Sequence, residues 1–232
     1  MFAFVRRCVR DEIIMTAIIL GSAIGIFGIA FGILAVNTGL TTLQTQCMSV
    51  FVFTGASQIA AVSIIATGGS QTTALIAALI LAMRNGLYGL RLIPIITGSL
   101  PKKLLAAQLI IDESTGMASS QTDQKDAFRA FWLGGISVFI FWNLGTLLGC
   151  LIGESVGDPK NLGLDMVFPV TFLALLMPQL TSVGRITIAM MASLIVLCTT
   201  PFLPLGIPIL LAALVALLPV IFPSFKYFKE NL

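Results

Sequence analysis

Long apolar runs alternate with short polar turns along most of this chain. A helix needs about 20 apolar residues to cross the hydrocarbon core of a bilayer, and most of the runs approach or exceed that length. The pattern predicts an all-α integral membrane protein, a bundle of seven or eight transmembrane helices with broken members, forming a single transporter domain over residues 1–232. The apolar runs cover residues 13–36, 43–66, 72–96, 131–152, 164–180, 186–199 and 206–222.

The second run is polar at its centre, where a membrane helix should be driest. Thr54, Gly55, Ser57 and Gln58 lie there. The bilayer core has no water to satisfy polar groups, so they need a protein partner, a cavity or a ligand. We expect a helix break over residues 54–58, a new helix starting near Gly55, and the floor of a substrate site. The alternative is that these residues only pack neighbouring helices together.

Two further interruptions fall in the middle of the chain. Arg84-Asn85-Gly86 divides the third run, where charge in lipid is costly, so we expect the helix to break there or two half-helices to meet. Residues 102–129 are the most polar stretch, and the apolar segment within it, 104–120, could cross, re-enter or lie at the interface.

A weak internal echo appears at an offset of 117 residues. Gly28 and Gly32 correspond to Gly145 and Gly149. It predicts repeat halves 13–120 and 128–223, with Arg84-Asn85 and Pro201-Phe202 as equivalent breaks. Two repeats around a midplane site are the common plan of secondary transporters, although few identities support the echo and chance is the alternative.

Composition agrees with a membrane protein and limits its chemistry. The chain is 57% hydrophobic and 10% charged, with mean hydropathy +1.04, whereas soluble domains carry about 25% charged residues. The net charge of +3 reads as basic helix ends facing the cytoplasm, not as a nucleic-acid surface. We expect both termini inside, and eight crossings would place Lys102-Lys103 outside but residues 125–129 inside.

The chain has no histidine, and its four cysteines are scattered singly. Neither a Ser–His or Cys–His pair nor a metal-ligand spacing is present in the sequence. We therefore predict no enzyme, no catalytic residue, no metal and no cofactor. Proton coupling stays open, and without histidine it would need a carboxyl group such as Asp112, Glu113 or Asp165.

Several motifs, in order, resemble the AzlC family of branched-chain amino-acid exporters, over roughly residues 15–220. They are Phe31–Leu40, Met48-Ser49, Phe53–Gln58, Arg84-Asn85 with Tyr88, Asp112-Glu113-Ser114, Trp142–Thr146 with Gly149, and Gly163–Phe172. The resemblance implies the large subunit of a bacterial inner-membrane exporter of valine, leucine, isoleucine and sometimes methionine. It also implies a small hydrophobic partner of the AzlD type, for which the glycine faces Gly21–Gly32 and Gly145–Gly153 offer packing surfaces.

One motif departs from the family pattern. The family usually has Asn-x-Arg ahead of its tyrosine, whereas here Arg84 precedes Asn85. The basic residue of the site is therefore either Arg84, one helical turn before Tyr88, or Arg91.

An amino-acid substrate needs donors for its carboxylate, acceptors for its ammonium and a dry pocket for its side chain. Backbone N–H groups from Gly55 to Gln58, or Arg84, suit the carboxylate. Acceptors for the ammonium and apolar contacts complete the predicted substrate site, which comprises Gly55, Ser57, Gln58, Arg84, Asn85, Tyr88, Asp112, Trp142 and Phe172.

Two other functions stay open at this stage. One is an uptake permease or channel for another small neutral solute, because the direction of flux cannot be read from a sequence. The other is a non-transporting membrane scaffold. The polar centres at 54–58 and 84–85 argue against a scaffold, which has no use for costly polar breaks.

Overall fold

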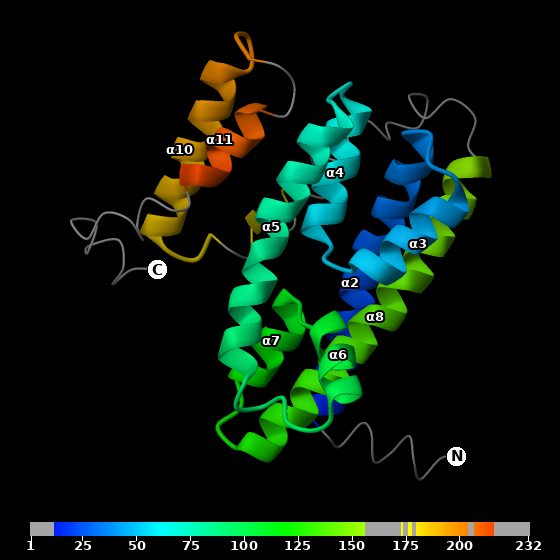
Figure 1. Cartoon of the computed structure of the whole chain (residues 1–232), viewed down its shortest axis with the longest axis vertical. Coiled ribbons are helices and arrows are strands. Elements are labelled where there is room, and N and C mark those ends of the chain that lie inside the picture. The colour runs from blue at the N-terminus through cyan, green and yellow to red at the C-terminus, as the bar shows by residue number, and fades with distance from the viewer. Residues whose placement is uncertain (1–11, 156–172, 174–175, 178–179, 204–206, 216–232) are drawn as a thin grey trace. The chain divides into compact units, whose positions relative to one another are not determined.

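The computed structural model describes residues 12–155, 173, 176–177, 180–203 and 207–215. Within these ranges the chain is helical and contains no strand, which confirms the all-α prediction. The helices in Figure 1 are α2 (Glu12–Asn37), α3 (Thr42–Val52), α4 (Ala56–Ala66), α5 (Gln71–Leu92), α6 (Leu100–Gln108), α7 (Asp112–Ser119), α8 (Gln124–Ser155), α10 (Val183–Thr199) and α11 (Ile207–Val215).

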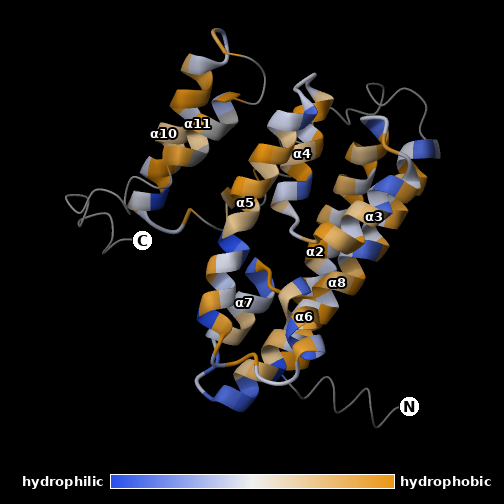
Figure 2. Ribbon diagram, in the orientation of Figure 1, coloured by the Kyte–Doolittle hydropathy of each residue, from blue (hydrophilic) through white to orange (hydrophobic). Residues whose placement is uncertain are grey.

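Three described helices, α2, α5 and α8, are long and apolar enough to span a membrane. Their surfaces are largely hydrophobic (Figure 2). On α5 an exposed stripe of Leu79, Met83, Leu87 and Leu90 recurs at helical spacing, as on a helix that faces lipid. The membrane assignment is thereby confirmed, while the number of seven or eight spans stays a prediction because it includes segments outside the described residues.

The chain divides into two compact units. The first holds residues 1–59 and 79–159, and the second holds residues 60–78 and 160–232. In the second unit α10 packs against α11. Every contact of the candidate site described below lies within the first unit. The predicted repeat halves 13–120 and 128–223 stay a prediction.

Helices α2 and α8 form a tightly packed parallel pair. Gly21 lies against Ser137 and Phe141, and Gly32 lies against Thr146 and Cys150, so both helices run in the same direction. A methyl group added at Gly28 would lie only 2.7 Å from the Trp142 carbonyl oxygen. The predicted close-packing role of these glycines is confirmed.

This pairing also corrects part of the argument for a partner. The two glycine faces, 21–32 and 145–153, pack against each other and do not form two free surfaces. The reason is geometric, since both faces consist of small residues that let two backbones approach within one chain. The expectation of a small subunit therefore rests on the family resemblance alone.

The interruption expected in α5 is absent. The helix continues from Gln71 to Leu92 through Arg84, Asn85 and Gly86. Neither an arginine nor an asparagine removes a backbone hydrogen bond, and one glycine in a helix costs only about 1 kcal/mol. The prediction of a break at Arg84-Asn85 was therefore wrong, and the proposed equivalence with Pro201-Phe202 loses its basis.

The second apolar run, predicted as one span over 43–66, is two half-length helices. Helix α3 ends at Val52 and α4 begins at Ala56. The Gln58 amide nitrogen lies 2.9 Å from the Met48 carbonyl oxygen, although ten residues of straight helix would extend about 15 Å. The chain therefore turns back sharply at residues 53–55, and the predicted break is confirmed at this position.

Helix α3 descends along α8 to this turn. Thr42 contacts Glu154, Ser49 contacts Thr146, and Phe53 contacts Phe139. The two helices are therefore antiparallel. Because Phe139 lies halfway along α8, the turn after α3 lies near the middle of the length that α8 spans.

Helices α6 and α7 form a re-entrant hairpin, one of the three arrangements left open for residues 104–120. The Lys102 ammonium lies 4.6 Å from the centre of the Phe128 ring, so α6 begins beside the first turns of α8. The hairpin turns at residues 109–111, where Leu109 packs against Gly135, and α7 then ends four residues before α8 starts.

This hairpin overturns the expected location of Lys102-Lys103. They lie at the same end of the first unit as Lys125 and Arg129, not at the opposite end. A segment that enters and leaves on one side does not change sides, which counting apolar runs cannot detect. Basic residues gathered at one end favour a cytoplasmic location for that end, which stays a prediction.

Candidate functional site

The site is built around two interrupted helices whose turns meet beside α5 and α8. The first turn has unusual backbone geometry: Phe53 has φ 28° and Gly55 has φ 61°. Glycine adopts the left-handed region without steric cost, which explains its presence at position 55. The Phe53 ring is held edge-on against Phe139 with 4.9 Å between ring centres.

Gln58 closes the first turn with its side-chain amide. Its Oε1 accepts hydrogen bonds from the backbone N–H of Gly55 at 3.0 Å and of Thr54 at 3.3 Å, and its Nε2 donates to the Met48 carbonyl at 2.9 Å. The side chain is fully buried. A single residue thus satisfies backbone groups that the break leaves without helical partners.

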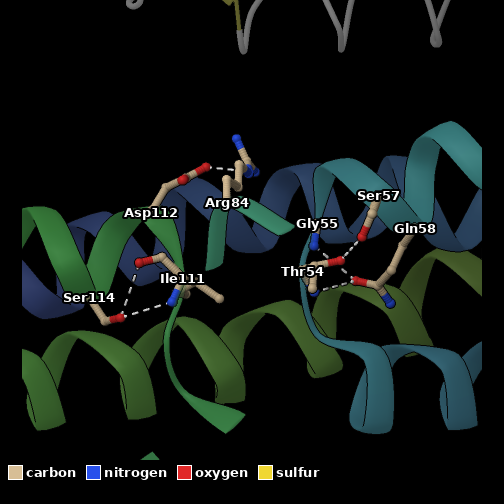
Figure 3. Close-up of polar contacts among 8 residues, drawn as sticks. All are labelled: Thr54, Gly55, Ser57, Gln58, Arg84, Ile111, Asp112 and Ser114. Carbon is tan, nitrogen blue, oxygen red and sulfur yellow. Dashed lines mark hydrogen bonds and ion pairs between the residues drawn. The ribbon is translucent and has the colours of Figure 1, made fainter. Parts of the chain in front are cut away.

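Ser114 does the same in the second turn. Its hydroxyl donates to the Leu109 carbonyl at 2.6 Å and accepts from the Ile111 N–H at 3.2 Å. Gln58 and Ser114 are each the third residue of the helix that follows the turn, α4 and α7 respectively. The two turns are therefore closed by polar side chains in equivalent positions (Figure 3).

Gln108 connects the two turns directly. It is the last residue of α6, and its Nε2 donates to the Val50 carbonyl at 2.7 Å, with the Phe51 carbonyl at 3.5 Å. These carbonyls lie in the last turn of α3, where the helix cannot satisfy them. The ends of α3 and α6 are thereby joined.

An ion pair lies at the start of α7. The Arg84 guanidinium on α5 is 2.7 Å from Asp112 Oδ2, and the two side chains point toward each other (Figure 3). The exposed fractions are 37% and 33%, so a small molecule can reach both. The Tyr88 hydroxyl, one turn along α5, interacts with the same carboxylate. The N-terminal end of α7 also favours this negative charge.

The structure thus brings Arg84, Tyr88 and Asp112 together as predicted. Asn85 is half-buried on α5 next to Arg84. Gly55, Ser57 and Gln58 lie in the first turn and the start of α4, where Ser57 is buried and hydrogen-bonded to the Thr54 hydroxyl.

The remaining predicted site residues divide into two groups. Trp142 is only 3% exposed and is stacked on Phe31, with its indole edge toward Gly55. This places it as a packing support for the first turn. Phe172, and the carboxyl candidate Asp165, lie outside the described residues.

Sequence reasoning missed Gln108 and the closing role of Ser114. Gln108 is a polar residue inside the apolar stretch 104–111, and Ser114 follows the end of that stretch by three residues. That signal resembles the one that singled out Gln58. Recognising it required knowing that residues 104–120 turn back instead of crossing.

Within the described ranges, no group of three or more acidic or cysteine residues could hold a metal ion. The side chains present are instead suited to binding charged groups of a ligand. A guanidinium and a carboxylate lie in contact at the start of α7. Such a site suits a small molecule bearing both an anionic and a cationic group.

The sequence model of the AzlC protein family matches residues 18–156. This segment contains both turns, the Arg84–Asp112 pair and all of α8. The chain belongs to the AzlC family. The family is one of transport proteins, which confirms the prediction of a membrane transporter and not an enzyme.

Several bacterial proteins share about a quarter of the aligned residues with this AzlC-family chain. An uncharacterized membrane protein of Helicobacter pylori (strain ATCC 700392 / 26695) is 23% identical over 156 residues, 66% of this chain and 68% of that protein. The branched-chain amino acid transport protein AzlC of Bacillus subtilis (strain 168) is 24% identical over 154 residues, 66% of this chain and 60% of that protein.

A third relative is the inner membrane protein YgaZ of Escherichia coli (strain K12), 28% identical over 156 residues, 64% of each chain. The match thus spans less than two thirds of the Bacillus and Escherichia proteins. No solved structure matches the chain.

Proposed function

We propose that this transporter exports branched-chain amino acids across the bacterial inner membrane. Valine, leucine and isoleucine, with methionine as a further substrate, are the proposed cargo. The observation that carries the proposal is the Arg84–Asp112 pair at the start of α7 in an AzlC-family chain. The Bacillus relative, named a branched-chain amino acid transport protein, supports the substrate class.

A free amino acid is a zwitterion, and the pair has matching charges. The substrate carboxylate can accept two hydrogen bonds from the Arg84 guanidinium, and the ammonium can donate to Asp112. Asp112 Oδ1 has no hydrogen-bond partner among the described residues, but it is buried, so an ammonium can use it only when neighbouring atoms move apart. Binding would then exchange one ion pair for two without leaving a charge unpaired.

The partner and the energy source complete the proposal. This chain would act as the large subunit with a small hydrophobic subunit of the AzlD type, as the family resemblance implies. Export would be coupled to protons through Asp112 or Glu113, the two carboxyl groups at the start of α7. No bound cofactor is needed for such a cycle.

Efflux from cells preloaded with labelled valine tests the function. Cells producing this chain with its small subunit should lose valine faster than cells lacking both, and each subunit alone should give little export. A protonophore should slow export if coupling is to protons. Unchanged valine, leucine, isoleucine and methionine efflux in cells shown to contain the folded complex would contradict the proposal.

Variants at the ion pair then test the site. Arg84→Gln removes a charged hydrogen-bond donor, a contact that contributes about 1.5 to 3 kcal/mol. Apparent affinity for valine should fall by roughly ten- to a hundredfold. The control is Arg91→Gln on the last turn of α5, which removes the same charge from the alternative basic position. If Arg91→Gln is the damaging variant, Arg91 and not Arg84 is the basic residue of the site.

A further inference from the structure

The contact between Gln108 and the end of α3 is the only hydrogen bond recorded between the two interrupted helices among the described residues. Gln108 Nε2 lies 2.7 Å from the Val50 carbonyl and 3.5 Å from that of Phe51. It therefore joins a hairpin that enters from one end of the first unit, α6 and α7, to a helix that descends from the other end, α3.

This contact is placed where it can be broken at low cost. Gln108 is half-buried and Phe51 is 76% exposed, unlike the fully buried Gln58 that closes the first turn. When the contact opens, only the carbonyls of Val50 and Phe51 lose a partner. By contrast, opening the Gln58 contacts would leave three backbone groups, the N–H groups of Thr54 and Gly55 and the Met48 carbonyl, without that partner.

Two surfaces of different kinds flank this contact. The α2–α8 interface is made of glycines with backbone-to-backbone contact, which leaves no room for sliding. The α3–α8 interface instead carries exchangeable hydrogen bonds, such as Ser49 to Thr146 and Gln46 to the Asn143 carbonyl. A moving part is therefore expected at α3 and its turn, against a fixed α2–α8 pair.

We propose that Gln108 is a positioning residue that holds the two turns together in one state of the transport cycle, and that this tie breaks when the site opens to the other side. The proposal rests on the proposed transport function. Asp112 follows Gln108 by four residues, so separating α6 from α3 displaces the carboxylate that contacts Arg84. Opening the tie and releasing substrate are thereby coupled.

A reversible cross-link tests the separation. Phe51→Cys and Gln108→Cys are combined in a chain whose four native cysteines are replaced by alanine. The complex is then treated with a short bifunctional methanethiosulfonate reagent. Cross-linking should lower valine efflux at least tenfold, and a reducing agent should restore it. In each single-cysteine chain, the same treatment should leave efflux at the level measured before treatment.

Removing the hydrogen bond without a cross-link gives a second, independent result. Gln108→Leu keeps the size of the side chain and should change the ratio of the two states about fivefold, which corresponds to about 1 kcal/mol. The readout is the rate at which a cysteine at position 49, buried against Thr146 in the tied state, reacts with a water-soluble thiol reagent. That rate should rise about fivefold, while Gln121→Leu, whose amide contacts only the adjacent Ser120, should leave it unchanged.

These results separate failure of this proposal from failure of the proposed function. If wild-type complex moves no branched-chain amino acid, the transport proposal fails, yet the reactivity at position 49 still reports on the tie. If wild-type complex transports and fully cross-linked complex transports equally fast, the turns do not separate and the proposal for Gln108 is wrong. Unchanged reactivity in Gln108→Leu would also overturn it.

Discussion

The side-chain amide of Gln58 donates to the Met48 carbonyl across the turn that separates α3 from α4. The same amide accepts from Thr54 and Gly55, so all of its recorded contacts are with the backbone of its own hairpin. These contacts with the turn are sufficient to explain why Gln58 is buried. A role in contacting substrate, which its position in the sequence suggested, remains a prediction.

Replacing Gln58 should therefore lower stability first. Gln58→Leu leaves two partly buried N–H groups and one carbonyl without this partner, at a cost of about 1 to 3 kcal/mol in total. The midpoint of thermal unfolding of the purified complex should fall clearly below that of Gln121→Leu. If folded Gln58→Leu protein is as stable as wild type but has lost efflux, the amide acts on substrate and not on the turn.

Gly55 should not tolerate a side chain, although space is available for one. A methyl group there would have Trp142 as its nearest contact at 3.9 Å, so the penalty comes from φ 61° and not from a clash. Gly55→Ala should lose about 1 to 2 kcal/mol of stability. Gly86→Ala is the matched control in the interior of α5, where open space and helical geometry predict a gain of about 0.5 to 1 kcal/mol. Equal effects of the two changes on the unfolding midpoint would contradict the left-handed turn.

The Arg84–Asp112 pair should show different patterns in stability and in transport. Arg84→Gln and Asp112→Asn each leave one charge unpaired, whereas the double variant removes both. Since about a third of each side chain is exposed, the coupling in stability should be no more than about 1 kcal/mol. Efflux per folded complex should stay at least tenfold low in all three variants. Recovery of efflux in the double variant would mean that the pair is structural and does not bind substrate.

The α2–α8 interface should be the least tolerant part of the first unit. At Gly32 a methyl group would overlap the Thr146 carbonyl oxygen, which belongs to a helix backbone and cannot move away. Gly32→Ala should cost about 1 to 3 kcal/mol or more through overpacking. Gly116→Ala on α7, with nothing near the added methyl, serves as the control. The yield of folded protein from membranes, measured by size-exclusion chromatography, distinguishes them.

The re-entrant hairpin makes a topological prediction. Cysteines introduced at Lys103 and Lys125 should both react with a membrane-impermeant reagent from the cytoplasmic side. A cysteine at Ser155 should react only from the other side, because α8 extends about 48 Å over its 32 residues. Labelling of positions 103 and 125 from opposite sides would show that α6 and α7 cross the membrane.

The sequence by itself determined that this protein lies in a membrane and where its first helix break is located. In lipid, a single apolar segment can satisfy its own backbone hydrogen bonds only as a helix. The apolar runs of spanning length therefore predicted helices, and the structure shows them as α2, α5 and α8. Gly55 beside Gln58 in a dry run predicted a break for a local reason, the left-handed geometry that glycine permits. The glycines of α2 likewise predicted close packing from their spacing alone.

Only the tertiary structure decided how these elements pair. Hydropathy does not distinguish a segment that crosses the membrane from one that turns back. Residues 104–120 could therefore cross, re-enter or lie at the interface, and the position of Lys102 beside Phe128 shows that they turn back. Polar residues in α5 suggested a break, yet the helix continues through Arg84, whose charge pairs with Asp112 from a distant hairpin. The glycine faces could have met a partner, and they meet each other instead. Long-range pairing depends on which surfaces are complementary in space, and no local pattern encodes that choice.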